Sequence, residues 1–354
     1  MVEQNKGEWS EFYVFLKLLG DGILYAADAD LEKIEDVYYN LVSVIRCENN
    51  RKIKYYRDND IRIFDENGTE LDCLFTINDF RTKAEVLLNT IKRTSKTTFG
   101  IPEIENFMQK IHCTKVKADS KDKSDINLEL HDRKYPSLQE FGFSIKSKLG
   151  SPPTLLNAAH ATNFIYEIQG NISKQQIEEI NAIDTSSKLK DRINKLFHFN
   201  CRLKYVRVEN TYFQYNLEMI DTMFPQIMAQ CLLQYYQGSS SLISQLTQYV
   251  LNESPEQITF CQYKMKLFLT AIALGMVPSK LWNGSYSATG GYIIVRSDGE
   301  ILCYHCYNHN EFQEYLFKNT KFETPSTKRH GFGLVYSENN KNYFKLNLQI
   351  RFID

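Results

Sequence analysis

Three features of this sequence predict a mixed α/β fold. Residues 8–20 are apolar almost all round, as in a buried helix. Residues 125–130 and 142–150 alternate apolar and polar side chains, which is the pattern of half-buried β-strands. Residues 172–280 have a mainly helical pattern, and strand-like alternation returns over 285–353. We therefore expect a core of helix and strands, a helical insertion and a β-rich C-terminal segment.

The remaining elements are predicted from the same periodicities and from turn residues. Helices are expected over 31–45, 82–92 and 102–111, and in a short stretch from Pro152-Pro153 through Ala161. Strands are expected over 52–64 and 71–76, as a hairpin around Glu66-Asn67-Gly68-Thr69, and over 163–168. A polar loop is expected over 120–124, leading into the first of the alternating strands.

Each of these two alternating strands has one polar face. The polar residues are Asp125, Asn127 and Glu129 on the first strand, and Ser144, Lys146 and Lys148 on the second. An aspartate beside a lysine suits metal-assisted cleavage of a phosphodiester, because the carboxylate holds Mg²⁺ and the ammonium orients or polarises a water. A polar strand face is also what many antiparallel sheets show to solvent. The alternation alone leaves both interpretations open.

The first predicted helix carries two glutamates near its start. Glu11 lies just before the apolar run 14–19, where a carboxylate is costly to bury without a cation or metal. Glu8 fits better the preference of a first helical turn for negative charge. We therefore expect Glu11 to be the glutamate with a role in a metal site.

Asp125 followed by Ser144-x-Lys146 resembles the signature of PD-(D/E)XK nucleases, with a serine in the place of the second acid. The segments 5–11, 144–150, 324–326 and 346–352 further resemble the HpaII family of type II restriction endonucleases. The resemblance implies a PD-(D/E)XK restriction-endonuclease-like core, Mg²⁺ as cofactor and cleavage of double-stranded DNA at 5′-CCGG. It also implies a restriction–modification system in which a cognate DNA methyltransferase protects the host.

The resemblance assigns roles to particular residues. It implies that Asp125 binds the metal, Lys146 positions the attacking water or stabilises charge on the phosphate, and Glu11 supplies the other carboxylate. Ser144 belongs to the catalytic motif but cannot ligate a metal as an ionised carboxylate does. The second acidic ligand is therefore open between Glu11, Glu129 and Glu8.

Several later residues are candidates for binding DNA. The basic run 188–195 continues through Arg202, Lys204 and Arg207 and could follow phosphates, although a solvated helix face has the same composition. Residues 346–352 are expected to form one C-terminal strand, in which the apolar residues alternate with Asn, Gln and Arg, the side chains that read purine edges. The candidates for DNA binding are Lys148, Lys195, Ser326, Arg329, His330, Asn347, Gln349 and Arg351.

We accordingly expect three regions with different roles. Residues 1–170 would form the catalytic core, 171–284 a mainly helical DNA-binding region, and 285–354 a β-rich segment for target recognition. The net charge of −1 over 354 residues gives no general attraction to nucleic acid, so DNA must be bound by local basic clusters.

Composition also bears on the setting of the protein. Eight scattered cysteines indicate reduced thiols, and the polar N-terminus resembles no signal peptide. We expect a soluble, cytoplasmic protein with no membrane partner. A homodimer is one arrangement that would cut both DNA strands.

Two other functions fit parts of the same pattern. A structure-selective nuclease, such as a junction resolvase, would share the acidic and lysine residues but need no base-reading strand. A non-catalytic DNA-binding protein would carry Ser144 as the mark of a dead site. Cleavage of a plasmid into discrete, Mg²⁺-dependent fragments would distinguish a restriction endonuclease from both.

Overall fold

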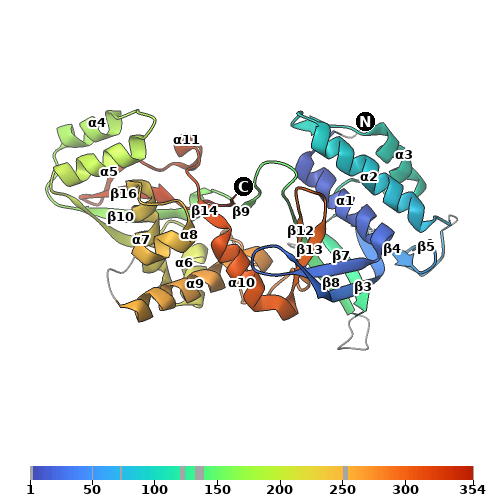
Figure 1. The fold of residues 1–354 in the computed structure, drawn as a ribbon. Helices are drawn as coiled ribbons and strands as arrows, with labels where there is room; N and C mark the ends of the chain where they lie inside the picture. Colours follow the sequence, from blue (N-terminus) through green and yellow to red (C-terminus); the bar gives the residue numbers. More distant parts are fainter. Residues whose placement is uncertain are drawn as a thin grey trace. The chain divides into compact units, whose positions relative to one another are not determined.

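The computed structural model describes residues 3–49, 51–71, 74–119, 124–131, 139–249 and 254–353. The chain forms two compact units (Figure 1). The first unit contains Met1–Pro153 and Tyr286–Tyr315, and the second contains Thr154–Ser285 and Leu316–Ile353. The prediction of a mixed α/β fold is confirmed, since both units combine helices with sheets. The three-region division by role stays a prediction.

The first unit is organised around an eight-stranded sheet. In spatial order its strands are β2 (Ile23–Ala27), β13 (Ile301–His305), β12 (Gly291–Val295), β8 (Gln139–Ser147), β7 (Ile126–His131), β3 (Lys33–Glu48), β4 (Arg51–Arg57) and β5 (Ile61–Phe64). The pairs β12–β8 and β13–β2 are parallel and the other pairs are antiparallel. Because β2 also pairs with β3, the strands from β2 to β3 close into a ring of pairings.

Three helices pack with this sheet around a shared apolar core. They are α1 (Lys6–Asp21), α2 (Ile77–Arg93) and α3 (Pro102–Lys110), which lie beside one another in Figure 1. The side chain of Asn5 accepts from the Glu8 N–H and the Glu8 carboxylate accepts from the Asn5 N–H, a capping box that begins α1. Gly22 ends α1 in the left-handed region at φ 75°. Trp9, Phe12 and Phe15 on this helix are fully buried. A two-stranded pair, β1 (Gln4–Asn5) with β6 (Thr98–Phe99), adjoins the start of α1.

The second unit has two smaller sheets and most of the remaining helices. One sheet has the order β11 (Arg202–Val208), β10 (Asn163–Gln169), β16 (Lys341–Asn347), β15 (Val335–Glu338), and the other β14 (Thr320–Phe322), β17 (Ile350–Phe352), β9 (Thr154–Leu156). The helices are α4 (Lys174–Ala182), α5 (Lys188–His198), α6 (Thr211–Ile220), α7 (Phe224–Gln237), α8 (Ile243–Tyr249), α9 (Pro255–Leu274) and the short α11 (Thr327–His330). α10 (His309–Lys318) has residues in both units.

Two predicted helices are wrong. Residues 33–45 of the predicted helix 31–45 fall in the long strand β3, because their Val, Ile and Tyr side chains suit a pleated surface and three neighbouring strands pair with them. The stretch after Pro153 forms the strand β9 and the 3₁₀ turn η1 (His160–Thr162).

Other predictions hold in part. Residues 52–64 are two strands, β4 and β5, that pair with each other, while the turn around Gly68 brings Phe64 opposite Glu70. The helical region also contains the strand β11, and the C-terminal region also contains α10 and the 3₁₀ turn η2 (Cys306–Asn308). Of the expected loop over 120–124, residues 120–123 lie outside the described residues.

In the described ranges, no helix combines the length and the apolar character that spanning a membrane requires.

Candidate active site

Asp125 and Ser144 are in contact where β7 begins, beside the second half of β8. Asp125 directly precedes β7, and the antiparallel register sets Ile126 opposite Phe143. Asp125 Oδ2 accepts a hydrogen bond from Ser144 Oγ at 3.1 Å and one from the Ile145 N–H at 2.8 Å. Ser144 is buried, and the hydrogen bond from its hydroxyl restrains the carboxylate of Asp125. The serine of the motif therefore orients the acid.

Glu11 and Asp125 are joined by a lysine that lies in neither motif. Lys117 Nζ is 2.9 Å from Glu11 Oε1 and 3.3 Å from Asp125 Oδ1. The carboxylate side chains of Glu11 and Asp125 are only 16% and 15% exposed, whereas Lys117 is 45% exposed. Two acids from distant parts of the chain therefore share one cation at the edge of the buried core.

Lys146 lies in the same electrostatic environment. Its ammonium is 5.9 Å from the centroid of the Tyr292 ring on β12. Burial lowers the pKa of Lys146, although the charges of Asp125 and Glu11 act in the opposite direction. Tyr292 is itself fully enclosed, and its pKa is raised by burial and then by the charge of Asp125. The lysine is therefore a half-buried cation whose charge is held near two carboxylates.

The titration of Glu11 reflects its burial. Burial, followed by the charge of Asp125, raises the pKa of Glu11 from 4.5 to about 7, against the opposite effect of Lys117 and Lys146. Burial opposes the charge of Lys117, but Glu11 and Asp125 outweigh it and raise the pKa of that ammonium. The raised pKa of Lys117 shows that the two carboxylates stabilise a positive charge between them, whereas burial favours the uncharged form of Glu11.

The residues present fit a divalent metal ion. Glu11 Oε2 is a buried oxygen that accepts no hydrogen bond, and Lys117 already places a positive charge between Glu11 and Asp125. Carboxylate oxygens are ligands of hard cations such as Mg²⁺, which usually keeps several waters and binds through one or two carboxylates. The described residues contain no group of three or more His, Cys, Asp or Glu side chains that could hold a metal. Glu11 and Asp125 would therefore hold the ion with water or phosphate oxygens completing its shell.

The two other candidate carboxylates are engaged elsewhere. Glu129 on β7 is 2.7 Å from Lys54 Nζ and accepts a hydrogen bond from Ser43 Oγ at 2.7 Å. Glu8 forms the capping box at the start of α1. Of the three acids left open by the sequence, the structure brings only Glu11 to the cation that Asp125 also binds.

Lys117 is the residue that the sequence did not reveal. It is 106 residues from Glu11 and 8 from Asp125, in a loop between α3 and β7. Four lysines in the sequence between α3 and β7 are ordinary composition for a surface loop. Only the packing of α1 against the sheet shows that one of them reaches both carboxylates.

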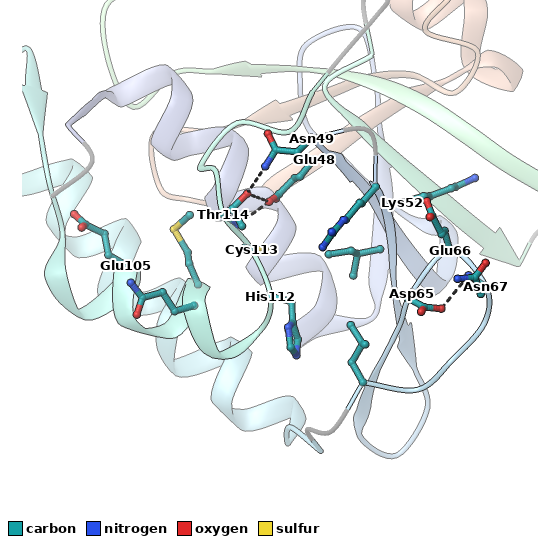
Figure 2. Close-up of a pocket in the computed structure, with 15 residues that line it drawn as sticks. Glu48, Asn49, Lys52, Asp65, Glu66, Asn67, Glu105, His112, Cys113 and Thr114 are labelled. Atoms are coloured by element: carbon teal, nitrogen blue, oxygen red, sulfur yellow. Dashed lines mark hydrogen bonds between the residues drawn. The ribbon is translucent and has the colours of Figure 1, made fainter.

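The first unit also has a wide cavity of about 1100 Å³, which is separate from the candidate active site (Figure 2). Charges of both signs line it, including Glu48, Lys52, Asp65 and Glu66. None of its lining residues is Glu11, Asp125 or Lys146. The candidate chemistry thus lies outside this cavity.

The second unit contains the candidate DNA-binding residues of the C-terminal loop. Ser326 and Arg329 are exposed, and Ser326 begins the short α11. A cleft of about 530 Å³ brings Ser326 together with lysines of α5 and α11; the basic residues on its wall are Lys188, Lys190 and Lys328. His330 is half-buried, and its pKa is lowered by burial and then by Arg329 and His160. This cleft is small, basic and rich in hydroxyl groups.

The C-terminal segment 346–352 differs from the expected single strand. It divides into β16 and β17, which belong to different sheets. Asn347 is fully buried and its amide nitrogen donates to Ala159 O and Asn163 Oδ1, so its side chain is not presented at the surface. Gln349 and Arg351 are half-buried, with Arg351 Nε 2.8 Å from Glu323 Oε2. The apolar residues of the segment are all buried, as expected: Leu346, Leu348, Ile350 and Phe352.

The basic residues of α5 and β11 include both a buried structural residue and exposed side chains. Arg192 is buried and donates to Gly333 O and Asn181 O, which ties the helix to its neighbours. Lys195 pairs with Glu179, and Arg202, Lys204 and Arg207 are exposed on the edge strand β11. In the first unit, the Lys148 N–H donates to Val295 O and its side chain is half-buried.

Comparison with known proteins adds evidence that is independent of this geometry. The family model described as HpaII restriction endonuclease matches residues 5–352. The type II restriction enzyme HpaII of Haemophilus parainfluenzae is 41% identical over 356 residues, covering 99% of this chain and 98% of that protein. No solved structure matches the chain.

Proposed function

The chain belongs to the HpaII restriction endonuclease family and is a type II restriction endonuclease, and from this premise we propose that it cleaves double-stranded DNA at 5′-CCGG with Mg²⁺ as cofactor. The observation that carries the proposal is that Glu11 and Asp125 share the ammonium of Lys117, while Lys146 is near enough for its charge to interact with both carboxylates. The target sequence is proposed from the family resemblance.

We infer that the sheet with α1 is a PD-(D/E)XK core. Asp125 enters β7, Lys146 lies on the antiparallel neighbour β8, and α1 supplies Glu11. The order of acid, serine and lysine on two adjacent strands follows the signature, with the helix supplying the carboxylate that Ser144 lacks. The support for this inference is the arrangement of these residues on α1, β7 and β8.

The residues divide the work of hydrolysis. Glu11 and Asp125 would hold the metal ion, which when bound lowers the pKa of a coordinated water and neutralises charge on the phosphate. Ser144 and the Ile145 N–H hold Asp125 Oδ2, so that the other carboxylate oxygen stays directed toward the shared cation. Lys146 contributes a positive charge that orients the attacking water or stabilises the phosphate as one P–O ester bond breaks.

DNA binding is proposed mainly for polar and basic side chains of the second unit. The candidates for contacting the target site are Ser326, Arg329, His330, Gln349 and Arg351. Lys195 of the second unit and Lys148 of the first unit are the candidates for contacting phosphates. The cleft around Lys188, Lys190 and Lys328 has the charge and the hydroxyl groups that a DNA phosphate binds. Asn347 would act through packing, since its amide is buried.

We propose the cellular setting from the same premise. An endonuclease with a four-base target would cut its host's DNA, so a cognate methyltransferase would protect those sites in the cytoplasm. A duplex has two strands, whereas the described residues of one chain form one cluster of Glu11, Asp125 and Lys117. Two copies acting as a homodimer would cut both strands.

Digestion of a sequenced plasmid tests the proposal. With Mg²⁺ we expect discrete fragments whose ends map to CCGG, and with a chelator we expect intact plasmid. Asp125→Ala serves as the control for a contaminating nuclease. Ends at other sequences would contradict the target, and a preference for branched junctions over the plasmid would contradict the proposed substrate.

A further inference from the structure

Lys117 occupies the place between the two carboxylates that are proposed to bind metal. Its ammonium is 2.9 Å from Glu11 Oε1 and 3.3 Å from Asp125 Oδ1. Two carboxylates that share a site repel each other unless a cation lies between them. Lys117 supplies that cation from within the protein.

The loop that carries Lys117 is held by a buried ion pair on β3. Glu48 accepts hydrogen bonds from the N–H and the hydroxyl of Thr114 at 2.6 and 2.8 Å, and Figure 2 shows these contacts. Arg46, 2.9 Å from Glu48, donates to Lys115 O at 2.8 Å and Val116 O at 3.2 Å. Both charged side chains are almost fully buried. The backbone just before Lys117 is therefore fixed.

The backbone just after Lys117 is fixed as well. The Asp119 N–H donates to Cys47 O at 2.7 Å, and Asp119 Oδ2 accepts from the Asn49 N–H at 2.6 Å. Arg46 also contacts the helix that carries Glu11, since its guanidinium carbon is 5.0 Å from the ring centroid of Phe15. One buried arginine thus touches both the loop of Lys117 and the helix of Glu11.

From these contacts we propose that Lys117 is a resident counter-ion that competes with the divalent metal for Glu11 and Asp125. The proposal rests on the proposed function, because it takes these two acids as the metal ligands. An ammonium and a metal ion cannot both occupy the space between the same carboxylate oxygens. Lys117 has a flexible stem and a 45% exposed side chain, so it can move into solvent when the metal enters.

This arrangement has two consequences for the enzyme. The carboxylates stay ordered in the metal-free state with one positive charge shared between them, and metal binding must displace the lysine. The metal concentration needed to fill the site is therefore higher than the two acids alone would require. Lys117 acts on the metal ligands and is a positioning residue.

Metal binding without DNA tests the proposal directly. Calorimetric titration of the full chain with Mg²⁺ should be done at about pH 9, so that Glu11 is ionised in the variants too, because losing Lys117 removes a charge that lowers the pKa of Glu11. It should show roughly fivefold tighter binding for Lys117→Met than for the wild type, the scale of a partly exposed ion pair. Lys117→Ala removes the same ammonium and should behave alike. Lys117→Arg keeps the charge and should resemble the wild type.

Lys115→Met is the matched control from the same loop. Lys115 pairs with Asp119 at 2.6 Å, so its loss should leave metal affinity unchanged. Asp125→Ala should abolish the binding signal, which identifies the site being titrated. Circular dichroism melting of each variant verifies that it is folded.

Unchanged or weaker Mg²⁺ binding in Lys117→Met and Lys117→Ala would overturn the proposal. So would the absence of binding in both variants, while plasmid cleavage by the wild type would still uphold the proposed function. Conversely, a wild type that binds metal but cleaves no DNA would remove the proposed function itself.

Discussion

The acids of the first unit and the basic side chains of the second unit are held in different ways. Glu11 and Asp125 are at most 16% exposed and are fixed by a loop lysine, a serine and a backbone N–H. Arg329 is exposed, and Arg351 forms a partly exposed pair with Glu323. Surface pairs of this kind contribute little to stability, so DNA can replace them at small cost. The chemistry is thus proposed for groups that the fold has preorganised, and recognition for groups that can exchange partners.

The largest effect is expected from a substitution that removes a part of the preorganised site. Asp125→Ala removes a proposed metal ligand and should lower the single-turnover cleavage rate of a CCGG duplex by at least ~10²–10³-fold. Specific DNA binding should persist or tighten, because a negative charge near phosphates is lost.

Asn127→Ala is the matched control on the same strand face, where Asn127 contacts Glu140. It should cleave close to the wild-type rate. Equal loss in both variants would mean that the strand pair has only a structural role.

Substitution of the proposed DNA-binding side chains should have smaller effects, seen in DNA binding. If Arg351 or Arg329 reads a guanine, its replacement by alanine should cost about 1–3 kcal/mol of discrimination at one base pair. Lys195→Ala should instead weaken binding to all sequences and lower the salt slope by roughly one. Fluorescence anisotropy with cognate and scrambled duplexes over a range of salt measures both.

An equal loss of affinity for cognate and scrambled duplexes in both arginine variants would contradict base reading by the C-terminal segment. The reader would then lie elsewhere in the second unit. The proposed role of Glu11 and Asp125 in the first unit would be unaffected by that result.

The smallest effect is a pH dependence of the preorganised site. With the pKa of Glu11 raised to about 7 in the metal-free protein, cleavage at low Mg²⁺ should fall as the pH drops through about 7. Higher Mg²⁺ should move this midpoint to lower pH, because metal and proton compete for the carboxylate. Initial rates against pH at two metal concentrations give the measurement, and a midpoint that does not move with metal would contradict the assignment.

The same shift has a defined sign for stability. Between pH 4.5 and about 7 the folded state of the metal-free protein holds the Glu11 proton more tightly than the unfolded state. The contribution of Glu11 to the free energy of unfolding is therefore full below this window and is lost as the pH rises through it. Glu11→Gln should lack this component in chemical denaturation.

The sequence predicted the local parts of the site but not its long-range contacts. Alternation predicted both strands, because the period of a strand is visible in a few residues. Lys146 lies on β8 as predicted, whereas Asp125, which was predicted on the first strand, directly precedes β7. The apolar first helix predicted that Glu11 would be buried. Lys117 could not be predicted, since its partner Glu11 is 106 residues away and only the packing of α1 brings them together.

Similar reasons explain the errors in the fold. The strand β3 was predicted as a helix because its apolar residues fit either period, and its pairing with β2, β4 and β7 decides the outcome. The C-terminal segment was predicted as one strand, but it divides between two sheets and buries Asn347. Alternation therefore identified the apolar side of this segment but not the environment of its polar residues.

The identity of the second metal-binding acid tests the central claim most directly. Single-turnover cleavage of a CCGG duplex at saturating Mg²⁺ should be compared for Glu11→Gln, Glu8→Gln and Glu129→Gln, each of which keeps the shape of the side chain and removes its charge. We predict a large loss of rate for Glu11→Gln alone, since only Glu11 shares a cation with Asp125. Near-normal cleavage by Glu11→Gln together with an inactive Glu129→Gln would contradict the account and place the metal shell wholly on the sheet.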